Sequence, residues 1–240
     1  MWKNINLEKC ITRINDLKHE DTEGAPAMRP SVTISRMAGA GGRTVASKLA
    51  DYLQPYAPYG RQWTIFDRNL IAQVLEDGHL SRQLADCYPE ASQPLLRELL
   101  LKLGRSNPSV STVVKQSVET IWKLAKGGYV ILVGRAANVI TAGQENVFHV
   151  RLEGSREKRI ARLETVYDFD LQAAVEYLKS QDAAKKLYLA DYFGRDIDDP
   201  LLYDMIVNTD EISFEQVAML IALAVIRRFD LEAQAKAAWA

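Results

Sequence analysis

The sequence predicts an α/β fold built on a doubly wound parallel sheet, and three observations support this. Five short β-rich runs alternate with segments of helical periodicity along the chain. The run over residues 129–133 is continuously apolar, as expected for a parallel strand covered on both faces. A glycine cluster follows the first run and leads directly into an amphipathic segment. Strands that alternate with helices in this way form a parallel sheet, with ligand sites at its carboxyl edge.

The composition is that of an ordinary globular protein of 240 residues, long enough for one large α/β domain. The formal net charge is −1, so no overall basic field predicts nucleic acid or an anionic membrane as a partner. Two cysteines and three scattered histidines lack disulfide or metal-ligand spacing. The chain shows no apolar leader, and its longest apolar run has ten residues, too short to span a bilayer. We therefore expect a cytoplasmic protein without a membrane segment.

The first strand ends at Arg36, and the helix behind it carries Val45, Leu49 and Leu53 on one face. Glycines between a strand and a helix let backbone N–H groups surround an anion, and phosphate is the ligand this favours. A glycine-rich turn without any ligand is the alternative interpretation. The cluster comprises Gly39, Ala40, Gly41, Gly42, Arg43 and Thr44.

This loop departs from the standard P-loop sequence, Gly-x-x-x-x-Gly-Lys-Ser/Thr. Aligned without a gap, Gly41 falls on the second glycine, Gly42 on the lysine and Arg36 on the first glycine. With one inserted glycine, Arg43 falls on the lysine and Thr44 on the hydroxyl that would contact Mg²⁺.

The other elements follow from periodicity and capping residues. Residues 1–29 hold an amphipathic helix and a linker that ends in Gly24-Ala25-Pro26, and 30–240 form the main domain. Two helical stripes between residues 78 and 126 are predicted core, while Ser155 and Ser213 are predicted helix caps. Further strands are predicted over 62–67, 129–133, 147–152 and 204–208.

Charged side chains follow the ends of the predicted strands. Arg36 ends the first, Asp67-Arg68 the second and Gly134-Arg135 the third, while a basic helix with Arg156, Arg159 and Arg162 follows the fourth. Phosphoryl transfer requires aligned and neutralised phosphates, which such a set can provide. Asp67 could hold a magnesium-bound water or orient the acceptor, or it could only cap the next helix. Arg135 could equally be a structural ion-pair partner.

The region 156–196 is predicted to form a lid. Its segment 168–195 combines a helical apolar face with Asp182, Lys185 and Lys186, as expected for a helical hairpin that closes over phosphates. A solvated charged helix is the alternative interpretation.

Together these segments resemble the cytidylate kinase-like branch of the P-loop nucleoside monophosphate kinases. The similarity covers roughly residues 31 to 228. The segments that support it are Ile34-Ser35-Arg36 through Arg43, Phe66-Asp67-Arg68, Val133-Gly134-Arg135-Ala136-Ala137, Phe148-His149-Val150-Arg151-Leu152 and Tyr203 through Asp210.

The resemblance implies a P-loop three-layer sandwich with a five-stranded parallel sheet, a helical monophosphate-binding insertion at 68–126 and the lid. It implies ATP and Mg²⁺ as cofactors and CMP or dCMP as acceptor. In that interpretation Arg36, Gly39–Thr44 and Arg159 bind ATP, and Thr44 contacts the metal. Asp67, Arg68, Arg135 and Asp182 bind the acceptor, while Arg43, Asp67, Arg135 and Lys185 are catalytic.

Two departures from the family pattern leave a second function open. The loop reads Gly-Gly-Arg where family members with the full P-loop have lysine, and the lid carries lysines where arginines are expected. Arginine differs from lysine in size and in the direction of its donors. The leading hypothesis is a nucleotide kinase that acts on CMP, dCMP or a related small monophosphate. The alternatives are a degenerate nucleotide sensor and a kinase of a different small phosphorylated acceptor. A homo-oligomer formed through the N-terminal or C-terminal helix is a further expectation.

Overall fold

The sheet of this protein has five parallel strands, and their order makes the chain doubly wound. The computed structural model describes residues 12–14, 28–67, 69, 71, 98–101, 103 and 112–238. The strands are β1 (Ser31–Arg36), β2 (Thr64–Phe66), β3 (Val130–Val133), β4 (Val147–Glu153) and β5 (Met205–Asn208), in the order β2-β3-β1-β4-β5. Every neighbouring pair is parallel, which confirms the predicted fold class. Because β1 lies between β3 and β4, the strand order reverses beside β1, where open sheets bind ligands.

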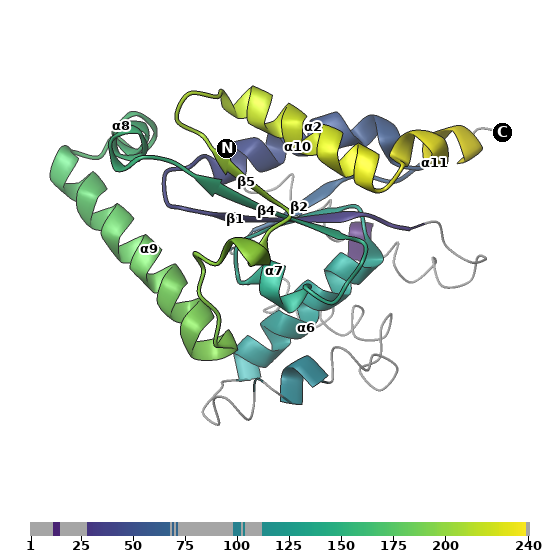
Figure 1. The fold of residues 1–240 in the computed structure, drawn as a ribbon, viewed down its shortest axis with the longest axis horizontal. Helices are drawn as coiled ribbons and strands as arrows, with labels where there is room; N and C mark the ends of the chain where they lie inside the picture. Colours follow the sequence, from purple (N-terminus) through teal and green to yellow (C-terminus); the bar gives the residue numbers. More distant parts are fainter. Residues whose placement is uncertain are drawn as a thin grey trace.

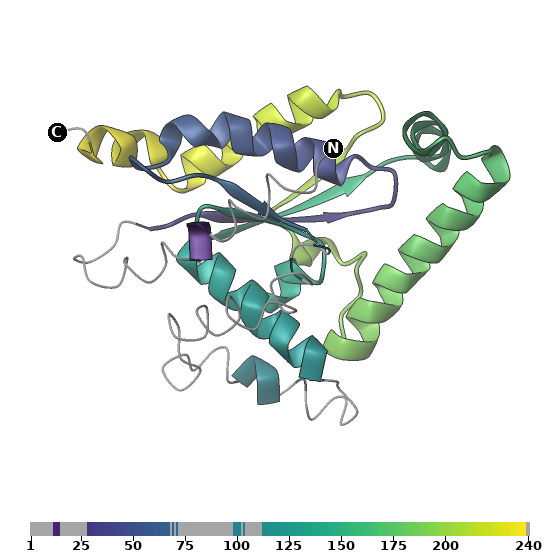
Figure 2. The same cartoon turned by 180° about the vertical axis from the view of Figure 1, so that it is seen from behind.

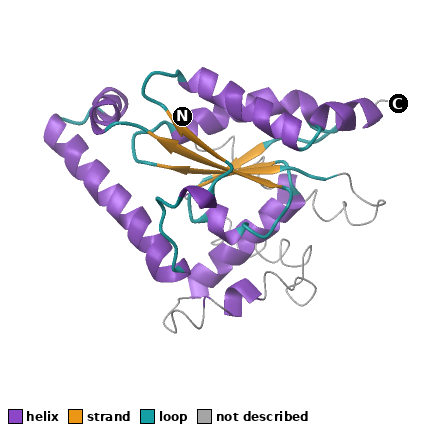
Figure 3. Cartoon of the chain, viewed as in Figure 1, coloured by secondary structure: helices purple, strands orange, loops and turns teal. Residues whose placement is uncertain are grey.

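Helices cover both faces of the sheet, so the molecule is a three-layer sandwich (Figures 1, 2 and 3). Ile131 and Val133 of β3 face one apolar core, while Val130 and Leu132 face the other. This alternation fits a strand that is buried on both faces. One layer contains α2 (Gly42–Leu53), the turn η1 (Gln54–Tyr56), α10 (Phe214–Arg228) and α11 (Leu231–Ala238), and the other contains α6 (Thr112–Gly127) and α7 (Ala137–Ile140).

The central strand β1 is apolar on one side and hydroxylated on the other. Val32 and Ile34 are fully buried against the α2 layer. On the opposite side, the Thr33 hydroxyl lies 2.8 Å from Nδ1 of His149, and the Ser31 hydroxyl donates to the Ala125 carbonyl at 2.9 Å. Burial lowers the pKa of His149. These bonds satisfy the buried polar groups and fix the strand that carries the glycine loop.

A pair of helices stands at the carboxyl edge of the sheet, where the helical hairpin of the lid was predicted (Figure 1). It consists of α8 (Arg156–Tyr167) and α9 (Leu171–Phe193), and the turn η3 (Pro200–Leu202) leads from it to β5. Figure 1 shows α8 end-on and α9 lengthwise, so the two helices are not antiparallel and the predicted hairpin is wrong in this respect. The predicted Ser155 cap is confirmed, since its hydroxyl accepts from the Lys158 amide at 3.3 Å. A small apolar cluster joins α8 and α9 to Ala38 of the glycine loop. The two helices therefore pack directly on the loop that follows β1.

The C-terminal helix α10 packs on α2 and leaves part of its surface apolar. Ser213 caps it through a capping box, as predicted, and Glu215 accepts from the Tyr52 hydroxyl at 2.6 Å. Met219, Leu220 and Leu223 remain exposed by 42–52%. The ten-residue apolar run is thus only half buried, and an oligomer through this helix stays a prediction.

Several predictions fall outside the part of the chain that is described. Of the N-terminal helix only residues 12–14 are covered, and there Ile14 is fully buried in the α6 core. Most of the insertion 68–126 is not covered, so its boundaries and those at 29/30 stay predictions. The later of the two stripes is confirmed as core: Val118, Ile121 and Trp122 of α6 are buried. Over the described residues, no helix is long and apolar enough to cross a bilayer.

Candidate functional site

The loop after β1 is shaped by glycines at positions where other residues would not fit. Gly39 and Gly41 have φ angles of +75° and +80°. A Cβ at Gly41 would lie 2.3 Å from the ring of Phe214, and one at Gly39 would lie 2.8 Å from the Arg159 carbonyl oxygen. Gly41 is the N-cap of α2, and no side chain caps that helix end. The first amides of α2 are therefore open to an anion, as the glycine cluster predicts.

Arg43 and Asp67, both predicted to be catalytic, form an ion pair. Arg43 Nη2 lies 2.5 Å from Asp67 Oδ2, and the Arg43 side chain is 63% exposed. The other oxygen, Asp67 Oδ1, accepts from the Asn69 amide at 2.9 Å, as in a helix cap. Asp67 therefore makes the contact expected of a helix cap and also lies beside the glycine loop.

A cavity of about 290 Å³ lies at the carboxyl ends of β1 and β3, beneath α9. Three cationic side chains from separate elements line it: Arg36 from β1, Arg135 after β3 and Lys185 from α9. Lys185 is paired with Asp182, at 3.1 Å between Nζ and Oδ1. In the part of the chain that is described, neither Arg36 nor Arg135 has an ion-pair partner. A cavity with this excess of positive charge favours an anionic ligand.

Two of the lining residues have unmet hydrogen-bonding capacity. Arg135 Nε and Asn138 Nδ2 are buried and have no hydrogen-bond partner among the described residues. Both are donors, so each would gain from an oxygen acceptor in the cavity. Burial raises the pKa of the nearby Tyr188 hydroxyl, and Arg135 opposes that shift. The cavity therefore offers charged and neutral donors together, which suits a phosphate oxygen.

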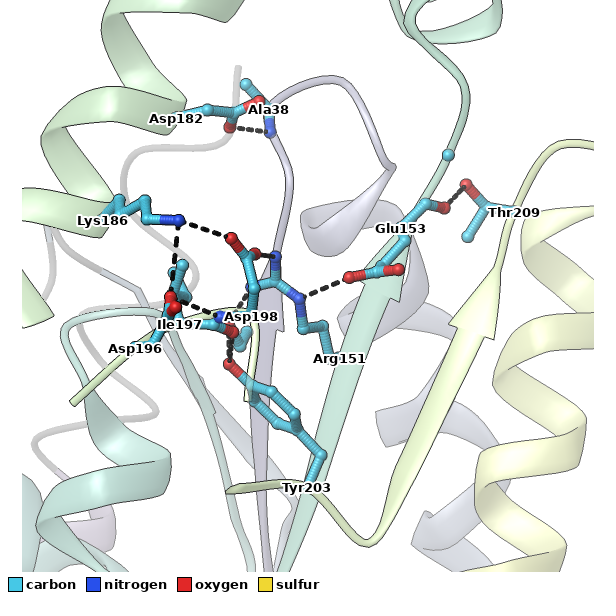
Figure 4. Close-up of polar contacts among 12 residues, drawn as sticks. Ala38, Arg151, Glu153, Asp182, Lys186, Asp196, Ile197, Asp198, Tyr203 and Thr209 are labelled. Atoms are coloured by element: carbon cyan, nitrogen blue, oxygen red, sulfur yellow. Dashed lines mark hydrogen bonds and ion pairs between the residues drawn. The ribbon is translucent and has the colours of Figure 1, made fainter. Parts of the chain in front are cut away.

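Asp182 of α9 binds the backbone of the glycine loop. Its Oδ1 accepts from the Ala38 amide at 2.7 Å, and its Oδ2 accepts from Arg159 Nη1 at 2.6 Å (Figure 4 shows the Ala38 contact). Burial alone would raise the pKa of Asp182, but the Ala38 amide, Lys185 and Arg159 outweigh it and lower the pKa. Arg159 also donates to the carbonyls of Ala38, at 3.1 Å, and Gly154, at 3.0 Å. These contacts hold α8 and α9 against the loop.

Acidification is expected to destabilise the protein partly through Asp182. A carboxyl whose folded pKa is lowered stabilises the fold above its ordinary pKa of about 4, and this contribution is lost as the pH falls below that value. We expect Asp182→Asn to lower the free energy of unfolding at pH 7 by about 1.5–3 kcal/mol. Between about pH 5 and 3, the variant should lose less of its free energy of unfolding than the native chain loses. Urea unfolding at several pH values measures both. Asp191→Asn, at an exposed position of the same helix, is the control, and equal pH profiles for the two variants would contradict this role.

A buried arginine, Arg151, donates to the hydroxyl of Ser35, which lines the cavity, and the sequence interpretation gave it no role. Arg151 of β4 is 3% exposed and lies opposite Ser35 of β1 in the sheet register. It donates to Glu153 at 2.7 Å and to Asp198 at 3.0 Å, and Asp198 in turn accepts from Lys186 at 2.9 Å (Figure 4). This network ties β4 to α9 and to the segment around Asp198. An arginine among the apolar residues Val150 and Leu152 of the strand was the signal in the sequence.

The remaining predicted residues are placed as follows. Thr44 is exposed in the first turn of α2, Gly42 is the first residue of that helix, and Ala40 is fully buried. Arg68 lies outside the described residues. No cluster of three or more potential metal-ligating residues occurs in the part of the chain that the structure describes.

Comparison with known proteins identifies a family and similar chains. Residues 31–211 match the model of the Cytidylate kinase-like family. A cytidylate kinase of Thermoplasma volcanium is 32% identical over 76 residues, which make up 32% of this chain and 40% of that protein. The chain thus aligns with less than half the length of this curated relative. The crystal structure of an uncharacterized protein from Eubacterium ventriosum has a TM-score of 0.56 and 18% identity, covering 82% of this chain and 98% of the other, and so shares the fold.

Proposed function

The chain belongs to the cytidylate kinase-like family, and from this premise we propose that it transfers the γ-phosphate of ATP to a nucleoside monophosphate. The observation that carries the proposal is the cavity beside the glycine loop, lined by Arg36, Arg135 and Lys185. CMP or dCMP is the proposed acceptor, because the similar protein of Thermoplasma volcanium is a cytidylate kinase.

The donor would bind at the glycine loop. The uncapped N-terminus of α2 and the left-handed glycines at 39 and 41 offer amide donors to phosphate oxygens. Magnesium bound to ATP takes most of its ligands from phosphates and water, so one or two protein oxygens suffice. Thr44 and Asp67 are the candidates for this contact. When bound, the ion would neutralise charge on the transferring phosphoryl group.

The acceptor phosphate would bind in the cavity. Arg135 and Asn138 would supply their unmet donors, and Lys185 would add charge from α9. Asp67 would orient the acceptor at the end of β2, and Arg68 and Asp182 are further proposed contacts. Helices α8 and α9 would exclude water, since α9 lies over the cavity and the loop.

A nucleotide sensor without transfer activity is the second candidate. Gly42 occupies the position of the P-loop lysine in the alignment without a gap, and the Ala38 amide is already occupied by Asp182. A sensor needs the donor site but no acceptor site. The cavity, with two arginines that lack a carboxylate partner among the described residues, therefore favours the kinase.

The deciding experiment measures ADP formation from ATP and Mg²⁺ with purified protein. CMP, dCMP, UMP, AMP and GMP are offered in turn, with Asp67→Asn as the blank. Turnover with one monophosphate that is lost in the blank supports the kinase and names its acceptor. ATP binding without turnover on any of the monophosphates supports the sensor.

A further inference from the structure

The glycine loop differs from the standard P-loop at two positions, where a cationic residue and a glycine have changed places. In the alignment without a gap, Arg36 stands at the first glycine and Gly42 at the lysine. The standard lysine contacts the phosphates between which transfer occurs. A loop without this lysine needs another cation beside the phosphates. Two arginines are available: Arg43, next to Gly42, and Arg36, six residues before Gly42.

The side chain of Arg36 fills the space that Gly42 leaves empty. A Cβ at Gly42 would lie 2.9 Å from Cγ and 3.2 Å from Cδ of Arg36. The guanidinium then reaches the loop after β3, where a Cβ at Gly134 would lie 2.1 Å from Arg36 Nη1. Gly42 and Gly134 thus leave room for the Arg36 side chain, which extends from the glycine loop to the wall of the cavity.

Arg43 and Arg36 differ in whether their charge is paired with a carboxylate of the described residues. Arg43 is paired with Asp67 and its side chain is 63% exposed. Arg36 is partly buried, and no hydrogen bond or ion pair engages its guanidinium within the described residues. Burial, and then the nearby Arg43, lower the pKa of Arg36. A partly buried guanidinium without a paired anion gains strongly from a bound phosphate.

We propose that Arg36 takes over the role of the P-loop lysine, and that Gly42 and Gly134 are glycines because the Arg36 side chain crosses both positions. The inference rests on the proposed function, since it assigns a donor-phosphate contact within the same site. The Arg36 guanidinium would donate to donor phosphate oxygens where the glycine loop meets the cavity. Arg43 would instead position Asp67.

The test is to move the cation back to its standard position. ADP–Mg²⁺ binding is measured by calorimetry, without acceptor, for the native chain and four variants: Arg36→Met, Arg43→Met, Arg36→Gly, and Arg36→Gly combined with Gly42→Lys. Methionine keeps an unbranched side chain but lacks the positive charge of arginine. We expect a loss of affinity of about a hundredfold for Arg36→Met and Arg36→Gly, and less than about fivefold for Arg43→Met. The double variant should recover at least about tenfold over Arg36→Gly.

Three results would overturn the inference: native affinity in Arg36→Met, an equal loss in Arg43→Met, or no ADP binding by the native chain. If the double variant does not fold, Arg36→Met and Arg43→Met decide between the two arginines. The proposed function is tested by a different result, the turnover of a monophosphate. If ADP binding depends on Arg36 but no monophosphate supports turnover, Arg36 keeps its assignment and the kinase is rejected. Turnover that survives in Arg36→Met supports the kinase and rejects the role of Arg36.

Discussion

Replacing Asp67 by asparagine is expected to lower kcat about a thousandfold, the order lost when a preorganised charged or polar group is removed from a transition state. The carboxylate ends β2 beside the glycine loop, within 2.5 Å of Arg43. Asparagine keeps the volume and an oxygen that can accept from the Asn69 amide, so the helix cap survives. Only the negative charge is removed. The ADP-release assay gives kcat, and urea unfolding gives the stability.

The free energy of unfolding should change by less than about 1 kcal/mol in this variant, because the partner Arg43 is largely exposed and screened by water. Asp51→Asn removes the same charge from an exposed position of α2 and is the control. If Asp67→Asn retained its kcat and lost only stability, Asp67 would be a helix cap and nothing more.

Replacing Arg135 by methionine is expected to raise KM for the monophosphate on the order of a hundredfold, with a smaller change in KM for ATP. Among the described residues, its buried Nε has no hydrogen-bond partner and no carboxylate is paired with the guanidinium. Methionine keeps the unbranched chain and, like arginine, has a Cβ at this left-handed position, where φ is +57°. The affinity of a phosphate oxygen for the guanidinium is the main quantity that changes. Steady-state kinetics with each substrate varied in turn measures it.

Stability should stay level or rise in Arg135→Met, since an unsatisfied donor and one of three clustered cations are removed. Arg156→Met, on the exposed face of α8, removes the same charge away from the cavity and should leave both KM values unchanged. A clear drop in stability with unaltered KM would instead make Arg135 a structural residue.

The fold was predictable because its signals are local. The continuous apolar run at Val130–Val133 can be a strand only if both of its faces are buried, and both faces are covered. Ser155 and Ser213 cap their helices because a hydroxyl can satisfy a free amide three residues later. The sequence patterns that predict these features span only a few neighbouring residues, so they are visible without the rest of the molecule.

The site was predictable only in part. The rule that ligands gather at the carboxyl ends of parallel strands identified Arg36, Asp67 and Arg135, and two of these line one cavity. The same rule cannot say which way a long side chain points. Arg43 turns outward to Asp67, whereas Arg36 turns inward across Gly42. The contact of Asp182 with the Ala38 amide joins residues 144 positions apart, and no local pattern encodes it.

The sequence by itself determined the order of strands and helices, the glycine-rich turn and the set of charged residues at the sheet edge. It could do so because periodicity, capping and backbone freedom act over a few residues. Only the tertiary structure decided which charges neutralise each other and which stay open to a ligand. Packing brings α8 and α9 together over the carboxyl edge of the sheet, so Asp182 meets Arg159, Arg151 meets Asp198, and Arg36 and Arg135 are left facing the cavity.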